Sequence, residues 1–262
     1  MPLFFSDFDS EKKAFVNPND TVQRQADFPS IAVSTFSGDI IDDYVKACKP
    51  PEIARLYTAN GSLPVYQIEY KGNKIALFVS RVGAPACVAG LEEIIAMGAQ
   101  KIVLFGCCGV LNENATKGKI ILPTSAIRDE GTSQYYFPHS DEIVADKNCI
   151  KIVADFLSEY NIPFVCGKVW TSDAIYRETP NLIAKRKEQG CLGVEMECAA
   201  SIAVARFRNI PFVQFLFGAD NLDCEEYDMR DLILYGRNAG NKYLSLAFEC
   251  GIRLSGVSTF GE

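Results

Sequence analysis

Short, almost wholly apolar segments alternate along this sequence with longer segments whose apolar residues share one helical face, and this alternation constrains the fold most. The strand-like segments are residues 30–36, 65–70, 74–80, 101–105, 119–127, 163–170 and 211–217. The helix-like segments are residues 38–49, 85–98, 149–160, a stretch beginning near Met196, and 228–254. Strands that are apolar along their whole length are buried on both faces. The pattern therefore predicts α/β architecture: a single three-layer α/β/α domain around a mixed, mostly parallel sheet.

The chain divides into two regions of unequal size. Residues 1–28 are polar and are expected to form a loosely held N-terminal segment, and residues 29–262 are expected to form the α/β domain. Neither a Pro/Gly/Ser-rich linker nor an evident internal repeat interrupts the larger region. A domain of this length buries a substantial core.

The charge balance argues against several classes of partner. The chain carries 26 Lys and Arg against 33 Asp and Glu, a formal net charge of −7, with no basic cluster. Nucleic acid and anionic membranes are therefore not expected as partners, because neutralising their phosphates requires a concentrated basic face. A small anionic substrate needs only a few donors and is compatible with this balance. The apolar runs are too short for a membrane span and the first residues lack signal-peptide features, so we expect a cytoplasmic protein.

The ten cysteines are scattered through the chain, many of them in apolar segments. The sequence has no Cys-x-x-Cys pair and no Cys/His spacing typical of a metal site, and His139 is the only histidine. We therefore expect reduced thiols and no bound metal. A Ser-His-Asp or Cys-His mechanism would have to use His139, which disfavours that class of enzyme.

Ligands of parallel α/β sheets bind at the carboxyl ends of the strands, so the residues that follow each predicted strand are the candidates for a site. Gly106-Cys-Cys-Gly109 follows the strand 101–105, and its glycines permit close approach to an anion or a sugar or, alternatively, form a tight turn. Arg81 stands between a strand and a proline-initiated helix, where it suits a phosphate or carboxylate or is simply solvated.

The most informative stretch is 193–200, where Glu195 and Glu197 flank Met196 at a predicted strand-to-helix junction inside apolar sequence. Two such carboxylates can accept hydrogen bonds from the vicinal hydroxyls of a ribose. Alternatively, they complement the dipole of the helix that follows. Asp220 follows the last predicted strand, where a carboxyl group either donates a proton or caps a turn.

Four of these motifs, taken together, resemble the nucleoside phosphorylase-I superfamily in order and spacing. The motifs are Gly106-Cys-Cys-Gly109, Thr171-Ser-Asp-Ala-Ile-Tyr176, Val194-Glu-Met-Glu-Cys-Ala-Ala200 and Gly218-Ala-Asp220. The resemblance covers roughly residues 30–254, and Glu-Met-Glu is its most specific part. The superfamily includes purine nucleoside and uridine phosphorylases and the methylthioadenosine and AMP nucleosidases.

The resemblance implies a role for each matched position. Ribose would be held by Glu195, Met196 and Glu197, and the base by Ile175, Tyr176 and Phe217. His139 either reaches the ribose of a neighbouring subunit or is a solvent-exposed loop histidine. Phosphate would be held by Arg81, Gly38 and Cys107. Asp220 would protonate N7 of a purine leaving group. The implied assembly is a homodimer, or a hexamer built from dimers, with inorganic phosphate as co-substrate and no further cofactor.

The sequence also departs from the superfamily pattern. Residues 37–42 lack the Pro and Arg of the usual phosphate loop, and Leu104 replaces a second phosphate-binding arginine. Residues 177–180 lack the Gln and Arg with which uridine phosphorylases read uracil, whereas residues 128–133 resemble a loop of AMP nucleosidases. We therefore expect a nucleoside phosphorylase that releases the base, purine rather than uracil, and forms ribose 1-phosphate. The alternatives are a nucleosidase that uses water and a catalytically silent nucleoside-binding protein.

Overall fold

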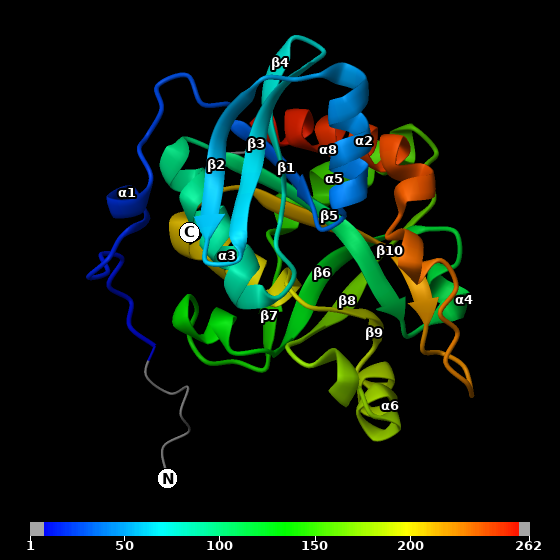
Figure 1. Cartoon of the computed structure of the whole chain (residues 1–262). Coiled ribbons are helices and arrows are strands. Elements are labelled where there is room, and N and C mark those ends of the chain that lie inside the picture. The colour runs from blue at the N-terminus through cyan, green and yellow to red at the C-terminus, as the bar shows by residue number, and fades with distance from the viewer. Residues whose placement is uncertain (1–7, 257–262) are drawn as a thin grey trace.

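The computed structural model describes residues 8–256 and shows a mixed ten-stranded sheet with helices on both faces (Figure 1). The strands are β1 (Ile31–Thr35), β2 (Glu52–Thr58), β3 (Gly61–Tyr70), β4 (Asn73–Val79), β5 (Lys101–Val110), β6 (Ile120–Asp129), β7 (Glu142–Val144), β8 (Phe164–Ser172), β9 (Cys191–Glu195) and β10 (Phe212–Asn221). The α-helices are α1 (Pro18–Thr21), α2 (Gly38–Cys48), α3 (Ala84–Met97), α4 (Glu113–Thr116), α5 (Lys147–Glu159), α6 (Pro180–Glu188), α7 (Cys198–Arg208) and α8 (Gly240–Arg253).

Five of the strands close into a ring. β5 pairs with both β10 and β9, and the sheet runs from β10 through β6 and β8 back to β9. Outside the ring, β1 pairs in parallel with β5, and the antiparallel strands β4, β3 and β2 extend the sheet from β1. The central pairings are parallel, as predicted: they are β1–β4, β1–β5, β5–β10, β6–β8 and β8–β9. The antiparallel pairings lie toward the β2 edge of the sheet or join strands over only a few residues.

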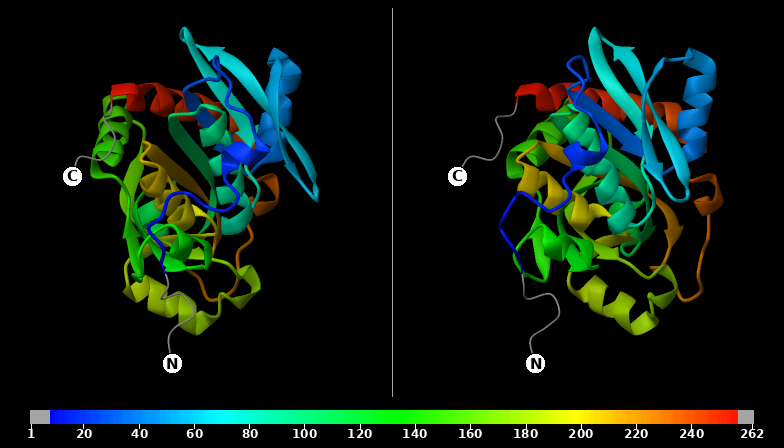
Figure 2. Two further views of the ribbon diagram at one scale, coloured as in Figure 1. Left: turned by 90° about the vertical axis from the view of Figure 1, so that its left-hand side faces the viewer. Right: turned by 60° about the vertical axis from the view of Figure 1, so that its left-hand side comes forward.

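The helices complete a three-layer arrangement, which confirms the predicted fold class. α8 packs on β1 and β5, with α2 and α5 beside it, and α3 packs against α7 on the other face (Figures 1 and 2). The side chains between the layers form one large apolar cluster. Its aromatic members include Phe105 and Phe215, whose rings stack at 5.3 Å.

Gly106-Cys-Cys-Gly109 does not follow the strand, and it is not the tight turn considered as one alternative, because it forms the last part of β5. Neither glycine has a positive φ. Both are required by close packing, because a Cβ at Gly106 would lie 2.8 Å from Phe36 Cδ2 and one at Gly109 would lie 2.5 Å from Leu222 Cδ1. β10 likewise continues four residues beyond the predicted end and includes Asp220.

The predicted helix over 228–254 is wrong in its first half. α8 begins only at Gly240, and residues 222–239 form a long connection with two short 3-10 turns, η3 (Leu232–Leu234) and η4 (Arg237–Ala239). The backbone leaves the right-handed helical region at Arg230 and Tyr235 (φ 43° each) and at Gly236 (φ 77°), where a Cβ would lie 2.4 Å from Phe217 Cζ. β2 and α6 were not predicted. Only Leu56 of β2 is buried, as in an edge strand with one covered face.

The N-terminal segment follows the outside of α3. The backbone N–H of Gln25 donates to the carbonyl of Met97 (2.9 Å), and Phe28 is buried as part of the core. Residues 1–7 of the predicted polar segment lie outside the described residues.

Gly109→Ala is expected to destabilise the protein. The added methyl group would meet Leu222 Cδ1 at 2.5 Å and Val194 Cγ1 at 3.1 Å, and overpacking of this kind typically costs about 1–3 kcal/mol. Urea unfolding measures the loss, with Gly38→Ala as the control, because nothing lies within 4 Å of a Cβ at Gly38. Equal stabilities of the two variants would contradict the close packing at Gly109.

Candidate active site

The carboxyl ends of β8, β9, β5 and β10 meet in one row. In register, Trp170 lies beside Val194, Val194 beside Gly109, and Gly109 beside Asp220. Glu195 is the last residue of β9, so its backbone lies about two strand spacings, or about 10 Å, from that of Asp220. The structure thus brings together the two acidic motifs that lie 25 residues or so apart in the sequence.

Glu195 is fully engaged by the protein itself. Its Oε1 accepts from the Thr171 hydroxyl (2.5 Å), and its Oε2 accepts from the backbone N–H groups of Glu197 (2.7 Å) and Cys198 (2.6 Å). The same Thr171 oxygen accepts from the N–H of Ala199 (2.9 Å). Glu195 therefore satisfies the first N–H groups of α7, which is the helix-terminal alternative considered for this pair.

Glu197 lies at the N-cap position of α7 and is 5% exposed. Its Oε1 accepts from the backbone N–H of Gly83 (2.6 Å), which directly precedes α3. Burial raises the pKa of Glu195 to about 7, and burial together with the charge of Glu195 raises the pKa of Glu197 to about 8. The two carboxyl groups interact and therefore titrate as a pair, and burial disfavours the form in which both are ionised.

Asp220 is a buried acid at the other end of the row. Its Oδ2 accepts from the hydroxyl of Tyr227 (3.0 Å), and burial raises its pKa. Glu178, which lies between the 3-10 turn η2 (Ile175–Arg177) and α6, interacts electrostatically with Asp220. Burial and the charge of Asp220 raise the pKa of Glu178 to about 7.

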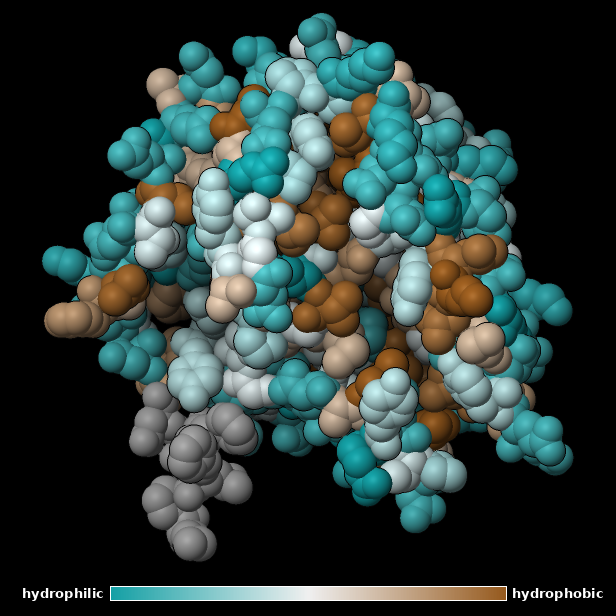
Figure 3. Space-filling view, in the orientation of Figure 1, coloured by the Kyte–Doolittle hydropathy of each residue, from teal (hydrophilic) through white to brown (hydrophobic). Residues whose placement is uncertain are grey.

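The three residues predicted to hold the base lie in two places. Ile175 and Tyr176 are exposed on η2, and Tyr176 is 94% exposed. Phe217 is buried, and its ring stacks on Tyr243 of α8 at 4.3 Å. Figure 3 shows apolar side chains between polar ones over the centre and right of the molecule's face. Phe217 also lines a groove of about 1200 Å³, which extends away from the acidic row between α4, α5 and α8.

Of the residues predicted to hold phosphate, Cys107 lies near the acids, and Arg81 precedes by two residues Gly83, the N–H donor to Glu197. Burial, together with the charges of Asp220 and Glu197, raises the pKa of the Cys107 thiol to about 11. Gly38 is the exposed first residue of α2. The guanidinium of Arg81 donates to the carbonyl of Leu56 (3.0 Å) on β2 and is near Glu93.

His139 is exposed, and its Nδ1 lies 3.3 Å from Gln134 Oε1. Its loop is held by the buried guanidinium of Arg128, which donates to the carbonyls of Phe137 (3.0 Å) and Pro138 (2.6 Å). In the described structure the side chain of Arg128 therefore stabilises this loop through hydrogen bonds to its carbonyl groups. The ribose, base and phosphate roles of the residues in the site stay predictions.

Sequence reasoning overlooked several groups beside the acids. Glu130 accepts from the N–H of Ser133 (2.9 Å), and Asp173 accepts from the N–H of Gly131 (3.0 Å). Glu130 interacts electrostatically with Glu195, and Asp173 with Glu197, so the site is strongly acidic. Thr171 and Asp173 belong to the motif 171–176, and Glu130 and Glu178 belong to the stretches 128–133 and 177–180 that were compared with other members of the superfamily, whereas Tyr227 belonged to no motif.

Among residues 8–256, no three His, Cys, Asp or Glu side chains are grouped so that they could hold a metal ion. Within the same residues, no helix combines the length and the apolar character that a membrane crossing requires.

Comparison with known proteins identifies the class to which a chain with this closed ring of strands and this acidic row belongs. The model of the phosphorylase superfamily matches residues 30–242, and the chain belongs to this superfamily.

Named relatives span several substrates. The chain is 25% identical over 192 residues to purine nucleoside phosphorylase DeoD-type 2 of Aliivibrio fischeri, covering 72% of this chain and 80% of that protein. It is 23% identical over 186 residues to guanosine phosphorylase of Halorubrum lacusprofundi, covering 71% and 76%. Among solved structures, uridine phosphorylase from Vibrio fischeri has a TM-score of 0.68 at 21% identity, covering 88% of this chain and 92% of that one. This last likeness concerns the fold.

Proposed function

We propose that the chain cleaves the N-glycosidic bond of purine nucleosides with inorganic phosphate, releasing the free base and ribose 1-phosphate. The observation that carries the proposal is the row of strand ends, which holds the buried acids Glu195 and Asp220 two strands apart, about 10 Å between their backbones, with buried Glu197 directly after β9.

Cleavage of the N-glycosidic bond requires a different group at each end of the row of strand ends. Breaking the bond leaves positive charge on the sugar and negative charge on the departing base. Glu197 accepts hydrogen bonds from the ribose hydroxyls, while Glu195 holds the start of α7 and thereby the position of Glu197. Asp220 donates its proton to N7 of the base, and burial favours the protonated form that this step needs. Ile175 and Tyr176 contact the base, and Tyr176 closes over it from η2.

The purine assignment rests on Asp220 and on the relatives named purine nucleoside and guanosine phosphorylase. We further propose a cytoplasmic homodimer, in which His139 of one subunit approaches the ribose bound by the other. Phosphate binds beside Gly38 and Cys107, and Arg81 must turn from Leu56 to reach it.

Hydrolysis is the second candidate reaction, favoured by one observation. In the described structure the guanidinium of Arg81 is bound to a carbonyl, and Leu104 stands where the superfamily has a phosphate-binding arginine. Water needs no cation to bind beside acids, whereas phosphate does.

Phosphate dependence separates the two reactions. We expect base release to stop when phosphate is removed and ribose 1-phosphate to form in equal amount with the base. A panel of nucleosides and nucleotides assayed with and without phosphate, with chromatography of both products, makes the measurement. Arg81→Ala is expected to raise the KM for phosphate and leave the KM for the nucleoside unchanged. Unchanged base release without phosphate, with free ribose as product, would establish hydrolysis instead.

A further inference from the structure

One contact of Asp220 belongs to no motif of the sequence. Tyr227 lies in the long connection between β10 and α8 and is 61% exposed. Its hydroxyl nevertheless reaches inward and donates to Oδ2 of Asp220 (3.0 Å), whose side chain is buried. An exposed aromatic residue thus covers the buried acid and holds one of its two oxygens.

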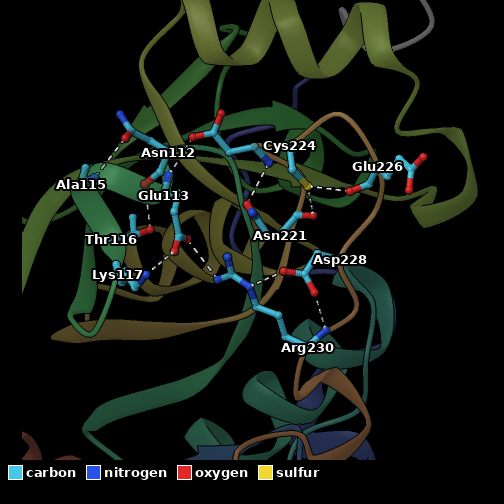
Figure 4. A network of polar contacts seen from close by, with 11 residues as sticks. Asn112, Glu113, Ala115, Thr116, Lys117, Asn221, Cys224, Glu226, Asp228 and Arg230 are labelled. Atoms are coloured by element: carbon cyan, nitrogen blue, oxygen red, sulfur yellow. Dashed lines mark hydrogen bonds and ion pairs between the residues drawn. The ribbon is translucent and has the colours of Figure 1, made fainter.

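Hydrogen bonds and an ion pair hold the connection in place on the N-terminal side of Tyr227. Figure 4 shows the network that links this connection to the segment around α4. Asp223 accepts from the backbone N–H of Glu113 (2.9 Å) and pairs with Lys187 of α6. The thiol of Cys224 lies within the turn, with its Sγ 3.2 Å from the carbonyl oxygen of Asn221 and 2.8 Å from that of Glu226, so that its one hydrogen can be donated to either.

Backbone hydrogen bonds and ion pairs also hold the connection on the C-terminal side of Tyr227. Asp228 and Asn221 exchange backbone hydrogen bonds of 2.8 and 3.3 Å, so that residues 221–228 form a closed loop. Arg230 pairs with Glu113 and Asp228, each at 3.0 Å (Figure 4). Tyr227 is therefore presented to Asp220 by a loop with fixed ends rather than by a free strand of chain.

Several other groups face Asp220 and set the balance of charge around it. They are Asp228 and Arg230 from the same loop, Glu178 from the segment before α6, and Cys107 and Cys108 from β5. Tyr227 adds to these charges a direct hydrogen bond to the carboxyl group (3.0 Å). Burial and the charges of Asp220 and Glu178 raise the pKa of Tyr227 to about 12, so its hydroxyl keeps its proton and acts as a donor at neutral pH.

We propose that Tyr227 is the positioning residue of Asp220: by donating to Oδ2 it makes Oδ1 the oxygen that carries the proton delivered to the leaving base. A carboxylic acid has one protonated oxygen, and a donor fixed on Oδ2 favours the form in which Oδ2 is the acceptor. Oδ1 lies on the side of β5, 3.5 Å from the position that a Cβ of Gly109 would take. The inference rests on the proposed function, because it assigns a task within that reaction.

The test is the pH profile of kcat/KM for a purine nucleoside in Tyr227→Phe. The Tyr227 hydroxyl stabilises the charged form of Asp220 and so lowers its pKa relative to burial alone. A general acid is active below its pKa, so activity is lost as pH rises through that value. Removing the hydroxyl should move this basic limb up by roughly half to one pH unit, while the loss of positioning should lower kcat by about tenfold on the low-pH plateau, where Asp220 is protonated in both proteins.

Two comparisons distinguish positioning from a general structural role. Tyr235→Phe, an exposed tyrosine of the same connection, should leave the limb and kcat unchanged. A riboside whose leaving group needs no proton should react equally fast in Tyr227→Phe and the unchanged protein. Equal losses on both substrates with an unmoved limb would overturn the proposal.

A titration that needs no turnover separates the inference from the proposed function. In protein labelled with ¹³C at aspartate carboxyl groups, the Asp220 signal, assigned with Asp220→Asn, should titrate at higher pH in Tyr227→Phe than in the unchanged protein. An unmoved titration overturns the inference even if nucleosides are cleaved. A moved titration in a protein that cleaves no nucleoside supports the contact and refutes the proposed function.

Discussion

Asp220→Asn is expected to lower kcat for purine nucleosides by about 10²–10⁴-fold, the range that general acid catalysis usually supplies. The asparagine keeps the shape of the side chain and still accepts from the Tyr227 hydroxyl, but it has no acid proton to give to the base. Burial of Asp220 raises the pKa of the carboxyl group and so favours the protonated acid that this step needs. The loss should therefore fall mainly on kcat.

The control for this prediction is a second kind of substrate rather than a second variant of the protein. Ribosides with a pre-activated leaving group need no proton, so Asp220→Asn should cleave them nearly as fast as the unchanged protein does. Urea unfolding should show similar stability for both. If the substitution slowed the two kinds of substrate equally, or neither, Asp220 would be structural and the purine assignment would lose its main support.

Glu195→Ala is expected to destabilise the protein by about 2–5 kcal/mol. It leaves the buried N–H groups of Glu197 and Cys198 without their acceptor, and each unsatisfied buried group costs about 1–3 kcal/mol. It also removes the acceptor of the Thr171 hydroxyl. Unfolding by urea can be followed by the fluorescence of Trp170, the only tryptophan, which is buried beside Thr171.

Glu195→Gln provides the matched variant. Its amide oxygen can still accept from both N–H groups of α7, while its amide nitrogen replaces the oxygen that faced Thr171. We expect less than half the destabilisation of the alanine variant. Equal stability of Glu195→Ala and the unchanged protein would show that Glu195 does not hold the start of α7, and its carboxylate would then be free for the ribose.

Most of the fold followed from local pattern, because apolar runs and helical faces are properties of short segments. The strand at 31–35, the hairpin that joins β3 to β4 and the helix α3 all lie where periodicity and turn residues predicted them. The errors arose where distant residues decide the structure. Gly109 is required by Leu222, and the helix predicted from 228 is interrupted where Gly236 lies against Phe217.

For the candidate site, the identity of its acidic residues could be predicted from the sequence, but their contacts could not. Glu195, Glu197 and Asp220 could be singled out because acids are conspicuous at the ends of apolar strands. What each carboxyl group contacts could not, since the donors to Glu195 include Thr171 on another strand and the donor to Glu197 is Gly83, more than 100 residues away. Tyr227 and Glu178 stood in polar loops, where nothing local distinguishes a residue that faces the site from a solvated one.

The closure of the strand ring has a consequence for how the protein is made. β10, the last strand in the chain, lies between β5 and β6, and its pairing with β5 joins residues more than 100 positions apart. Until residue 221 has left the ribosome, β5 lacks β10 as a neighbour, and the row that holds Asp220 does not exist. Contacts of such long range also form slowly during folding. The nascent chain therefore acquires the row of strand ends only after β10 has emerged, and truncation before β10 leaves β5 with an open edge and removes Asp220.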